Sequence, residues 1–274
     1  MFDNLLNEKF EVNFHNNTNC YAFEIPNFLN DEQYEQIKKN IPSFEKEDAK
    51  LLNENFSDEN NQHQLKVYIN ELNKEVYSKF ITNNPVLNEF SQIFKHPKMN
   101  NFFFKKFYSE ILRSRKYDPK NLLKLILRKN RTVNEKKNSF LDKLIYNDIY
   151  TTFEIAYMFN GAQSFPHTDG MKKILSLLLY FPDDNIPEEK IEKLGTSFYD
   201  SNEFNLTGLG KNKVNSFQDS KKFKDRNNII NTFPFKKKNL YGFIKSHKSW
   251  HSVEPFNISN NFVRKNININ MLLI

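Results

Sequence analysis

The sequence predicts an α+β protein: a double-stranded β-helix (jelly roll) core with an N-terminal, mainly helical region packed on one sheet. All six glycines lie between Gly161 and Gly242, and the first 160 residues contain none. Tight β-turns use glycine whereas helices avoid it. The part after residue 145 also consists of short apolar segments separated by turn signals, as in a jelly roll. We therefore expect one domain, in which residues 1–145 support a core at 146–274.

The chain begins with a predicted strand and a predicted helix. Residues 21–25, Tyr-Ala-Phe-Glu-Ile, are predicted to form a strand. A helix is expected from Asp31, because Asn30 is a good N-cap and apolar residues follow at helical spacing. These residues are Tyr34, Ile37 and Ile41.

Three further segments of the N-terminal region are predicted to be helical. Residues 64–83 carry an apolar stripe at helical spacing. The stripe consists of Leu65, Ile69, Leu72, Val76 and Phe80. Residues 86–113 and 121–128 have similar stripes. We interpret their aromatic residues as core, and not as a cofactor site.

Seven strands are predicted in the C-terminal part. They lie near residues 150–159, 165–168, 172–181, 196–200, 239–245, 249–254 and 263–272. Between the fourth and the fifth lies an insertion at 202–231, rich in Lys, Asn, Ser and Asp. A loop of this length inside a domain is either functional or a solvated surface segment. A substrate lid and a plain surface loop both stay open.

The composition excludes several classes of protein. Cys20 is the only cysteine, which excludes a disulfide framework and a cysteine-based zinc site. The N-terminus lacks the basic and apolar regions of a signal peptide. No stretch approaches the roughly 18 apolar residues of a membrane span. We expect a cytoplasmic protein without a membrane span; its oligomeric state is not predicted.

The net charge is +7, with an isoelectric point near 9.1. Such a charge can indicate an anionic substrate or nucleic acid. Here Lys and Asn are abundant along the whole chain and acidic residues are interspersed with them. We attribute the charge to this general bias, so nucleic acid is not the expected partner.

The most informative motif is His167-Thr168-Asp169, followed far downstream by His251. In an extended strand, residues i and i+2 point to one face, so His167 and Asp169 can reach the same ion. Two imidazoles and one carboxylate form the facial triad that suits non-haem Fe(II). His251 must then come from a strand that is a neighbour in space. His247 is the competing histidine, ranked lower because of its surroundings.

Arg264 begins a segment of strict alternation. One face is polar and consists of Arg264, Asn266, Asn268 and Asn270; the other consists of Lys265, Ile267, Ile269 and Met271. We expect the polar face to line the interior of the core and the other face to pack on the N-terminal helices. Arginine forms planar, two-pronged pairs with carboxylates better than lysine does.

This ordered set of motifs resembles the Fe(II)/2-oxoglutarate-dependent dioxygenases, in particular their prolyl 4-hydroxylase-like branch. Gly161 precedes His167 by six residues, and the apolar run 174–181 follows it. The segment around His251 reads Ser-Trp-His-Ser-Val-Glu-Pro, a context typical of the family's last core strands. Arg264 follows about a dozen residues later. The resemblance covers roughly residues 150–274, with a looser likeness near the N-terminus.

The resemblance implies the site residues and cofactors. The catalytic metal, Fe(II), would be held by His167, Asp169 and His251. The co-substrate 2-oxoglutarate would be bound by Arg264, Asn266, Tyr180 and Tyr157. The family usually has Ser or Thr where Asn266 stands, a departure that keeps a hydrogen-bonding group. O2 would complete the metal site, and ascorbate is a further candidate cofactor.

The implied reaction is hydroxylation of a C–H bond in a peptidyl (prolyl-like) or small-molecule substrate, with release of succinate and CO2. Halogenating relatives replace the triad carboxylate by a small residue, so Asp169 favours hydroxylation. Two alternatives stay open. One is a nucleic-acid demethylase of the same superfamily, although the second arginine of the repair branch is Asn270 here. The other is a non-catalytic jelly-roll binding protein. Cupin-type sites need further histidines that are not found.

Overall fold

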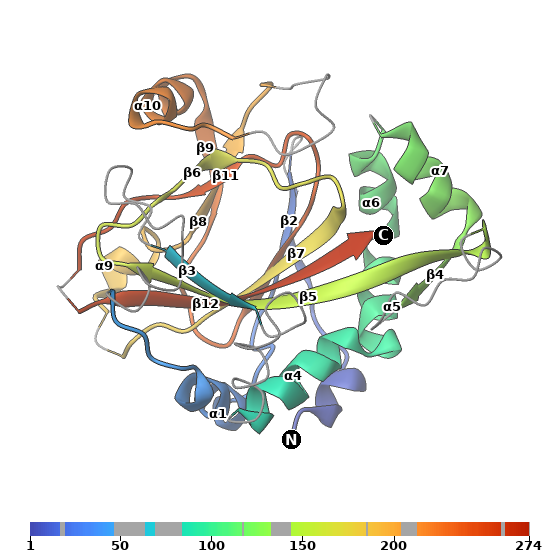
Figure 1. Cartoon of the computed structure of the whole chain (residues 1–274), viewed down its shortest axis with the longest axis horizontal. Coiled ribbons are helices and arrows are strands. Elements are labelled where there is room, and N and C mark those ends of the chain that lie inside the picture. Colours follow the sequence, from blue (N-terminus) through green and yellow to red (C-terminus); the bar gives the residue numbers. More distant parts are fainter. Residues whose placement is uncertain are drawn as a thin grey trace.

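The computed structural model describes residues 1–16, 20–46, 64–68, 84–116, 118–132, 144–184, 186–203, 213–258 and 261–273. They form an α+β protein with a large, mainly antiparallel sheet, a smaller sheet and a group of helices. Figure 1 shows α1 and α4 on one side of the large sheet and the small sheet on its other side.

The large sheet has the strand order β1-β2-β10-β7-β12-β5-β3, and β4 pairs with β5 in parallel. Its strands are β1 (Asn13–Asn16), β2 (Tyr21–Ile25), β3 (Gln64–Tyr68), β4 (Lys129–Thr132), β5 (Tyr146–Phe159), β7 (Lys173–Tyr180), β10 (Leu240–Ile244) and β12 (Val263–Leu273). The strand expected at 21–25 is confirmed. The glycine-free N-terminal region therefore supplies strands as well as helices to the fold.

The small sheet has the order β6-β11-β8-β9. Its strands are β6 (Ser164–His167), β8 (Thr196–Asp200), β9 (Asn228–Phe233) and β11 (His251–Val253). The strands from β5 to β12 form nested pairs: β5 with β12, β6 with β11, β7 with β10 and β8 with β9. This nesting brings together segments that are far apart in the sequence. All seven C-terminal strands predicted from the sequence are confirmed, to within a few residues.

The helices are η1 (Asp3–Leu6), α1 (Asp31–Asn40), α4 (Pro85–Lys95), α5 (Pro97–Lys106), α6 (Tyr108–Ser114), α7 (Pro119–Leu127), α9 (Glu188–Ile191) and α10 (Phe217–Arg226). Helix α1 begins as expected, since Asn30 and Gln33 form a reciprocal capping box. The segment 86–113 contains three helices. The first ends at His96 because Pro97 disfavours a helical conformation in the residue before it.

The core has two layers, one on each face of the large sheet. On one face, β5, β7 and β12 pack against the helices, and the rings of Phe90 on α4 and Phe153 on β5 are 5.8 Å apart. On the other face, a second cluster lies between the two sheets, where the rings of Phe198 and Phe243 are 5.2 Å apart. Ile267, on β12, belongs to the first layer. The predicted packing of the apolar face of β12 is therefore confirmed.

The helix predicted at 64–83 is wrong at its start. Gln64–Tyr68 is strand β3, which pairs antiparallel with β5, while residues 69–83 lie outside the described part. The five residues Gln-Leu-Lys-Val-Tyr alternate with a period of two as well as fitting a helical stripe. The edge of β5 decides between a strand and a helix for these residues, because its backbone N–H and C=O groups need partners that only a strand can supply.

The insertion predicted at 202–231 is longer than the one in the structure, because its last residues belong to a strand. Asn228–Asn231 belong to β9, which pairs with β8, and helix α10 precedes them; residues 204–212 lie outside the described part. The helix is docked, because the Phe223 and Trp250 rings are 4.7 Å apart. Strand β9 was missed because its polar ends hide the short apolar centre. Closure of this segment over a substrate stays a prediction.

Within the ranges described, no helix combines the length and the apolar character needed to cross a bilayer.

Candidate metal centre

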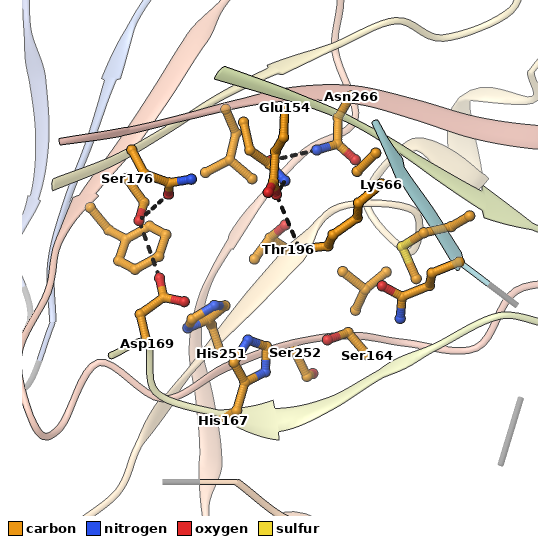
Figure 2. Close-up of a pocket in the computed structure, with 18 of the residues that line it drawn as sticks. Lys66, Glu154, Ser164, His167, Asp169, Ser176, Thr196, His251, Ser252 and Asn266 are labelled. Carbon is orange, nitrogen blue, oxygen red and sulfur yellow. Dashed lines mark hydrogen bonds and ion pairs between the residues drawn. The ribbon is translucent and has the colours of Figure 1, made fainter. Parts of the chain in front are cut away.

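His167, Asp169 and His251 meet at one end of the small sheet. His167 ends β6 and His251 begins β11, and the two are direct cross-strand partners. Their ring centroids are 4.3 Å apart. Asp169 follows two residues after β6, and the ligand atoms of all three side chains lie within 4.8 Å of one another (Figure 2). This group could hold a metal ion.

Backbone carbonyls set the orientation of both imidazoles. Nδ1 of His167 lies 2.7 Å from the Phe165 carbonyl oxygen, and Nδ1 of His251 lies 3.0 Å from that of Ser249. A carbonyl oxygen only accepts hydrogen bonds, so each Nδ1 carries the proton. Each Nε2 of the neutral ring then has the lone pair that a metal needs. Such outer hydrogen bonds are typical of histidine ligands.

The charges around the triad favour the protonation states that bind metal. Burial alone would raise the pKa of Asp169, but Lys173 and the two histidines bring it well below its usual value. Lys173 Nζ lies 3.0 Å from Asp169 Oδ1, and Ser176 Oγ lies 3.1 Å from Oδ2. Burial lowers the pKa of His251, despite the nearby carboxylate. At neutral pH the site therefore holds an ionised aspartate and a neutral His251.

Arg115 holds the turn that follows Asp169, a residue that the sequence analysis did not single out. It caps the C-terminus of α6 and is fully buried. Its Nη1 donates to the Met171 carbonyl at 2.6 Å and its Nη2 to that of Lys173. Asp118, 3.9 Å away, balances the charge. No motif marks Arg115, because its partners are backbone atoms some sixty residues away in the sequence.

The triad opens onto a cavity of about 110 Å³ between the two sheets. The large sheet contributes the four polar residues of β12, Arg264, Asn266, Asn268 and Asn270. The sequence prediction that this face lines the interior of the core is therefore confirmed. Hydrogen bonds connect the side chains of this polar face. Arg264 Nη1 donates to Asn266 Oδ1 at 2.6 Å, and Asn266 Nδ2 donates to Asn268 Oδ1 at 2.5 Å.

Arg264 is a buried cation without a carboxylate partner among the described residues. It is 2% exposed, and its Nε donates to the Leu194 carbonyl at 2.6 Å. Its Nη2 is buried and bonds to no described group. Burial lowers the pKa of Arg264, and a buried charge without a partner is costly. The open donor therefore marks a place for an anionic group.

The two predicted tyrosines lie on opposite faces of the large sheet. The ring of Tyr180 lies 5.1 Å from the Arg264 guanidinium, and its hydroxyl lies 2.7 Å from Thr196 Oγ1, which lines the cavity. Tyr157 instead belongs to the helix-facing core, where its hydroxyl donates to the Pro42 carbonyl at 2.9 Å. Assigning Tyr157 to the site is therefore wrong. Side chains alternate along β5, and those of Glu154, Ala156 and Met158 face the cavity.

His247, the competing histidine, is buried but does not belong to the group of possible metal ligands found among the described residues. Burial lowers its pKa, and Lys245 lowers it further.

The structure adds charged residues to the cavity that the sequence analysis did not assign. Glu154, Lys66 and Lys173 line it together with the triad. One signal for Glu154 was present, because it is the only charged residue in the apolar segment 149–159. Lys66 carries no comparable signal, since it was placed in a predicted helix.

No protein-family model matches this sequence. No curated protein matches it either.

Solved structures of 2OG-Fe(II) oxygenases do resemble the chain. A prolyl-4-hydroxylase from Pseudomonas putida shares 14% identity over 44% of this chain and 48% of its own, with a TM-score of 0.27. A 2OG-Fe(II) oxygenase family oxidoreductase from Burkholderia pseudomallei shares 10% over 56% of each chain, with a TM-score of 0.27. The α-ketoglutarate-dependent epimerase SnoN from nogalamycin biosynthesis shares 14% over 44% and 47%, with a TM-score of 0.30. The chain spans about half the length of these proteins.

Proposed function

We propose that this chain is an Fe(II)- and 2-oxoglutarate-dependent dioxygenase that hydroxylates a C–H bond of a peptidyl or small-molecule substrate. One observation carries the proposal: a triad of two histidines and one aspartate shares a cavity with a buried arginine that has an open donor. The prolyl 4-hydroxylase-like branch is the model for the arrangement. The nested strand pairs support a jelly-roll core from residue 146 onward, with residues 1–145 as its support.

The donor set fits Fe(II). Two imidazole nitrogens and one carboxylate oxygen form the facial arrangement of non-haem Fe(II) oxygenases, which leaves positions open for other ligands. His167, Asp169 and His251 would hold the ion. The carbonyls of Phe165 and Ser249 keep the rings in the required tautomer. Ser176 and Lys173 keep the carboxylate ionised and oriented.

The far wall of the cavity fits a dicarboxylate co-substrate. Arg264 Nη2 would hold its distal carboxylate, because a guanidinium binds a carboxylate through charge-assisted hydrogen bonds. Asn266 fixes Arg264 through its amide oxygen, and Tyr180 supports the guanidinium with its ring. When bound, Fe(II), 2-oxoglutarate and O2 supply the oxidising chemistry, which yields succinate and CO2. The protein's residues hold and orient these groups. Ascorbate stays a candidate reductant for the iron.

The experiment combines metal binding with turnover. Purified protein is expected to bind one Mn(II), as a stand-in for Fe(II), and to form succinate from 2-oxoglutarate with Fe(II). His251→Ala should greatly weaken metal binding and remove turnover, while His247→Ala is the matched control and should keep both. Normal turnover in His251→Ala would overturn the assignment. Absence of metal binding in the unaltered protein would instead support a non-catalytic binding protein.

A further inference from the structure

Glu154 is a buried carboxylate inside the cavity that the proposed chemistry does not use. Its side chain is 5% exposed, and it reaches from β5 into the space opposite the triad (Figure 2). Burial alone would raise its pKa, but Lys66, Lys173 and the amide of Asn268 lower it below the usual value. The group is therefore a permanent negative charge at neutral pH.

Only one of the two carboxylate oxygens is engaged by the described residues. Asn268 Nδ2 donates to Oε1 at 2.6 Å, and Lys66 Nζ donates to the same oxygen at 3.0 Å. Oε2 accepts no bond from a described group, and it is not among the sealed polar atoms that lack a partner. A carboxylate oxygen can only accept, so the open position selects a ligand that donates N–H or O–H bonds.

The residues that line the cavity thus include two unsatisfied groups of opposite character, a buried donor and an accessible acceptor. Arg264 presents a donor at one end of a chain of bonded amides, and Glu154 presents an acceptor at the other end, beyond Asn266 and Asn268. A dianion such as 2-oxoglutarate is attracted to the first position and repelled from the second. The acceptor position therefore belongs to the other substrate.

Lys66 indicates which donor fits. It lies on the edge strand β3, its side chain is 45% exposed, and its primary ammonium already lies against the carboxylate. An ion pair with one half-exposed partner is weak, because water screens it and ordering a long lysine side chain costs entropy. A ligand ammonium that is more deeply buried in the cavity can replace it, and the charge of Glu154 then stays balanced.

We propose that Glu154 anchors the substrate that is to be oxidised, and that the group it holds is a primary ammonium that binds the open Oε2 and competes with Lys66 Nζ for the charge of the carboxylate. The inference rests on the proposed function for the meaning of this subsite and names its substrate class: an amine such as a basic amino acid, free or in a peptide. In the unliganded protein Lys66 acts as an internal competitor for the site.

Opposite responses of two variants test the inference. Ligand-observed saturation-transfer NMR on the full chain without added metal would measure binding of n-butylammonium, with butanol as its neutral analogue. The unaltered protein should prefer n-butylammonium. Glu154→Gln, which keeps the shape of the side chain and an acceptor for Asn268, should weaken its binding at least tenfold. Lys66→Met should tighten it several-fold, and Lys265→Met, on the other face of β12, should leave it unchanged.

Three results would overturn the inference: binding of n-butylammonium that is no tighter than that of butanol, retained affinity in Glu154→Gln, or weaker binding in Lys66→Met. Should Glu154→Gln fail to fold, Lys66→Met decides by itself, since its affinity must rise. The measurement needs neither iron nor 2-oxoglutarate. Amine binding that follows the prediction in a protein without 2-oxoglutarate turnover would leave the inference standing and remove the proposed function. Turnover of 2-oxoglutarate together with amine binding that is unchanged in Glu154→Gln would support the proposed function and overturn the inference about Glu154.

Discussion

Nη1 of Arg115 lies 2.6 Å from the carbonyl oxygen of Met171, a contact that joins the helical N-terminal region to the turn carrying Asp169. The same guanidinium also binds the Lys173 carbonyl, so it spans the turn from both sides. Lys173 in turn pairs with Asp169. Arg115 therefore positions one candidate metal ligand without contacting the metal position itself.

The first prediction is that Arg115→Met weakens Mn(II) binding about 10- to 100-fold, the range typical of outer-shell changes around metal ligands. The turn would lose two hydrogen bonds, and Asp169 would lose its fixed orientation. Mn(II) titration by electron paramagnetic resonance would measure the affinity. Arg115→Lys keeps the charge but not the two-pronged contact. Its Mn(II) affinity should therefore lie between that of Arg115→Met and that of the unaltered protein. Arg131→Met, which removes a comparable ion pair with Asp148, should lower stability without this loss of affinity. An unchanged Mn(II) affinity in Arg115→Met would limit Arg115 to a purely structural role.

The second prediction concerns the anion position. Arg264→Ala should weaken 2-oxoglutarate binding by roughly 2–5 kcal/mol, the usual cost of removing one partner of a buried, hydrogen-bonded charge pair. Metal affinity should change far less. The Michaelis constant for 2-oxoglutarate and a Mn(II) titration would measure the two effects. Lys265→Ala is the control, because Lys265 is the adjacent residue on the opposite face of β12. If Lys265→Ala weakens 2-oxoglutarate binding more than Arg264→Ala does, then Lys265 and not Arg264 holds the carboxylate.

The third prediction separates the two tyrosines. Tyr180→Phe should weaken 2-oxoglutarate binding by at most about 1 kcal/mol, the value of one neutral hydrogen bond. It keeps the ring beneath Arg264 and loses only the hydroxyl beside Thr196. Tyr157→Phe should leave this binding unchanged and lower the free energy of unfolding by a similar amount, because it loses its bond to Pro42. Titration calorimetry and urea unfolding would be run on both variants. An effect of Tyr157→Phe on co-substrate affinity would contradict the assignment of faces.

The fourth prediction is a pH dependence of stability caused by Lys245. Burial lowers the pKa of this fully buried lysine to about 7, with Asp169 opposing the shift and Arg115 and Lys173 adding to it. In the unfolded chain its pKa is about 10.4. Between these values the unfolded state binds one more proton than the native state, so this group makes stability rise with pH.

Lys245→Met should therefore be more stable than the unaltered protein at pH 6, by a few kcal/mol. The difference should shrink as the pH rises above 7 and disappear only above about pH 10.4, where the lysine of the unfolded chain is neutral too. Urea unfolding of both proteins without metal, at pH 6 and pH 9, would measure it. A stability difference that is the same at both pH values would show that Lys245 stays charged in the native state.

The sequence by itself predicted seven strands between residues 150 and 272 and the three residues of the candidate triad. The apolar run that forms β7, the alternation in β12 and the turn glycines are local signals, and local signals define strand positions and faces. The spacing His-x-Asp predicts that two ligands point to the same side, although in the structure Asp169 lies in the turn after β6. Strict alternation predicts a polar and an apolar face of β12, and the polar site expected in the core assigned the polar face to the interior.

Only the tertiary structure decided which segments become neighbours, because that depends on pairing between residues far apart in the chain. It placed Gln64–Tyr68 as a strand on the edge of β5, where the local period allowed a helix. It directed Tyr157 to the helix-facing core and Tyr180 to the layer between the two sheets beside Arg264, although both are tyrosines in apolar strands. It also brought Arg115 to the turn after Asp169, and Lys66 to Glu154. These contacts join backbone carbonyls and single charges across 50 to 90 residues, and no local period or motif encodes such pairs.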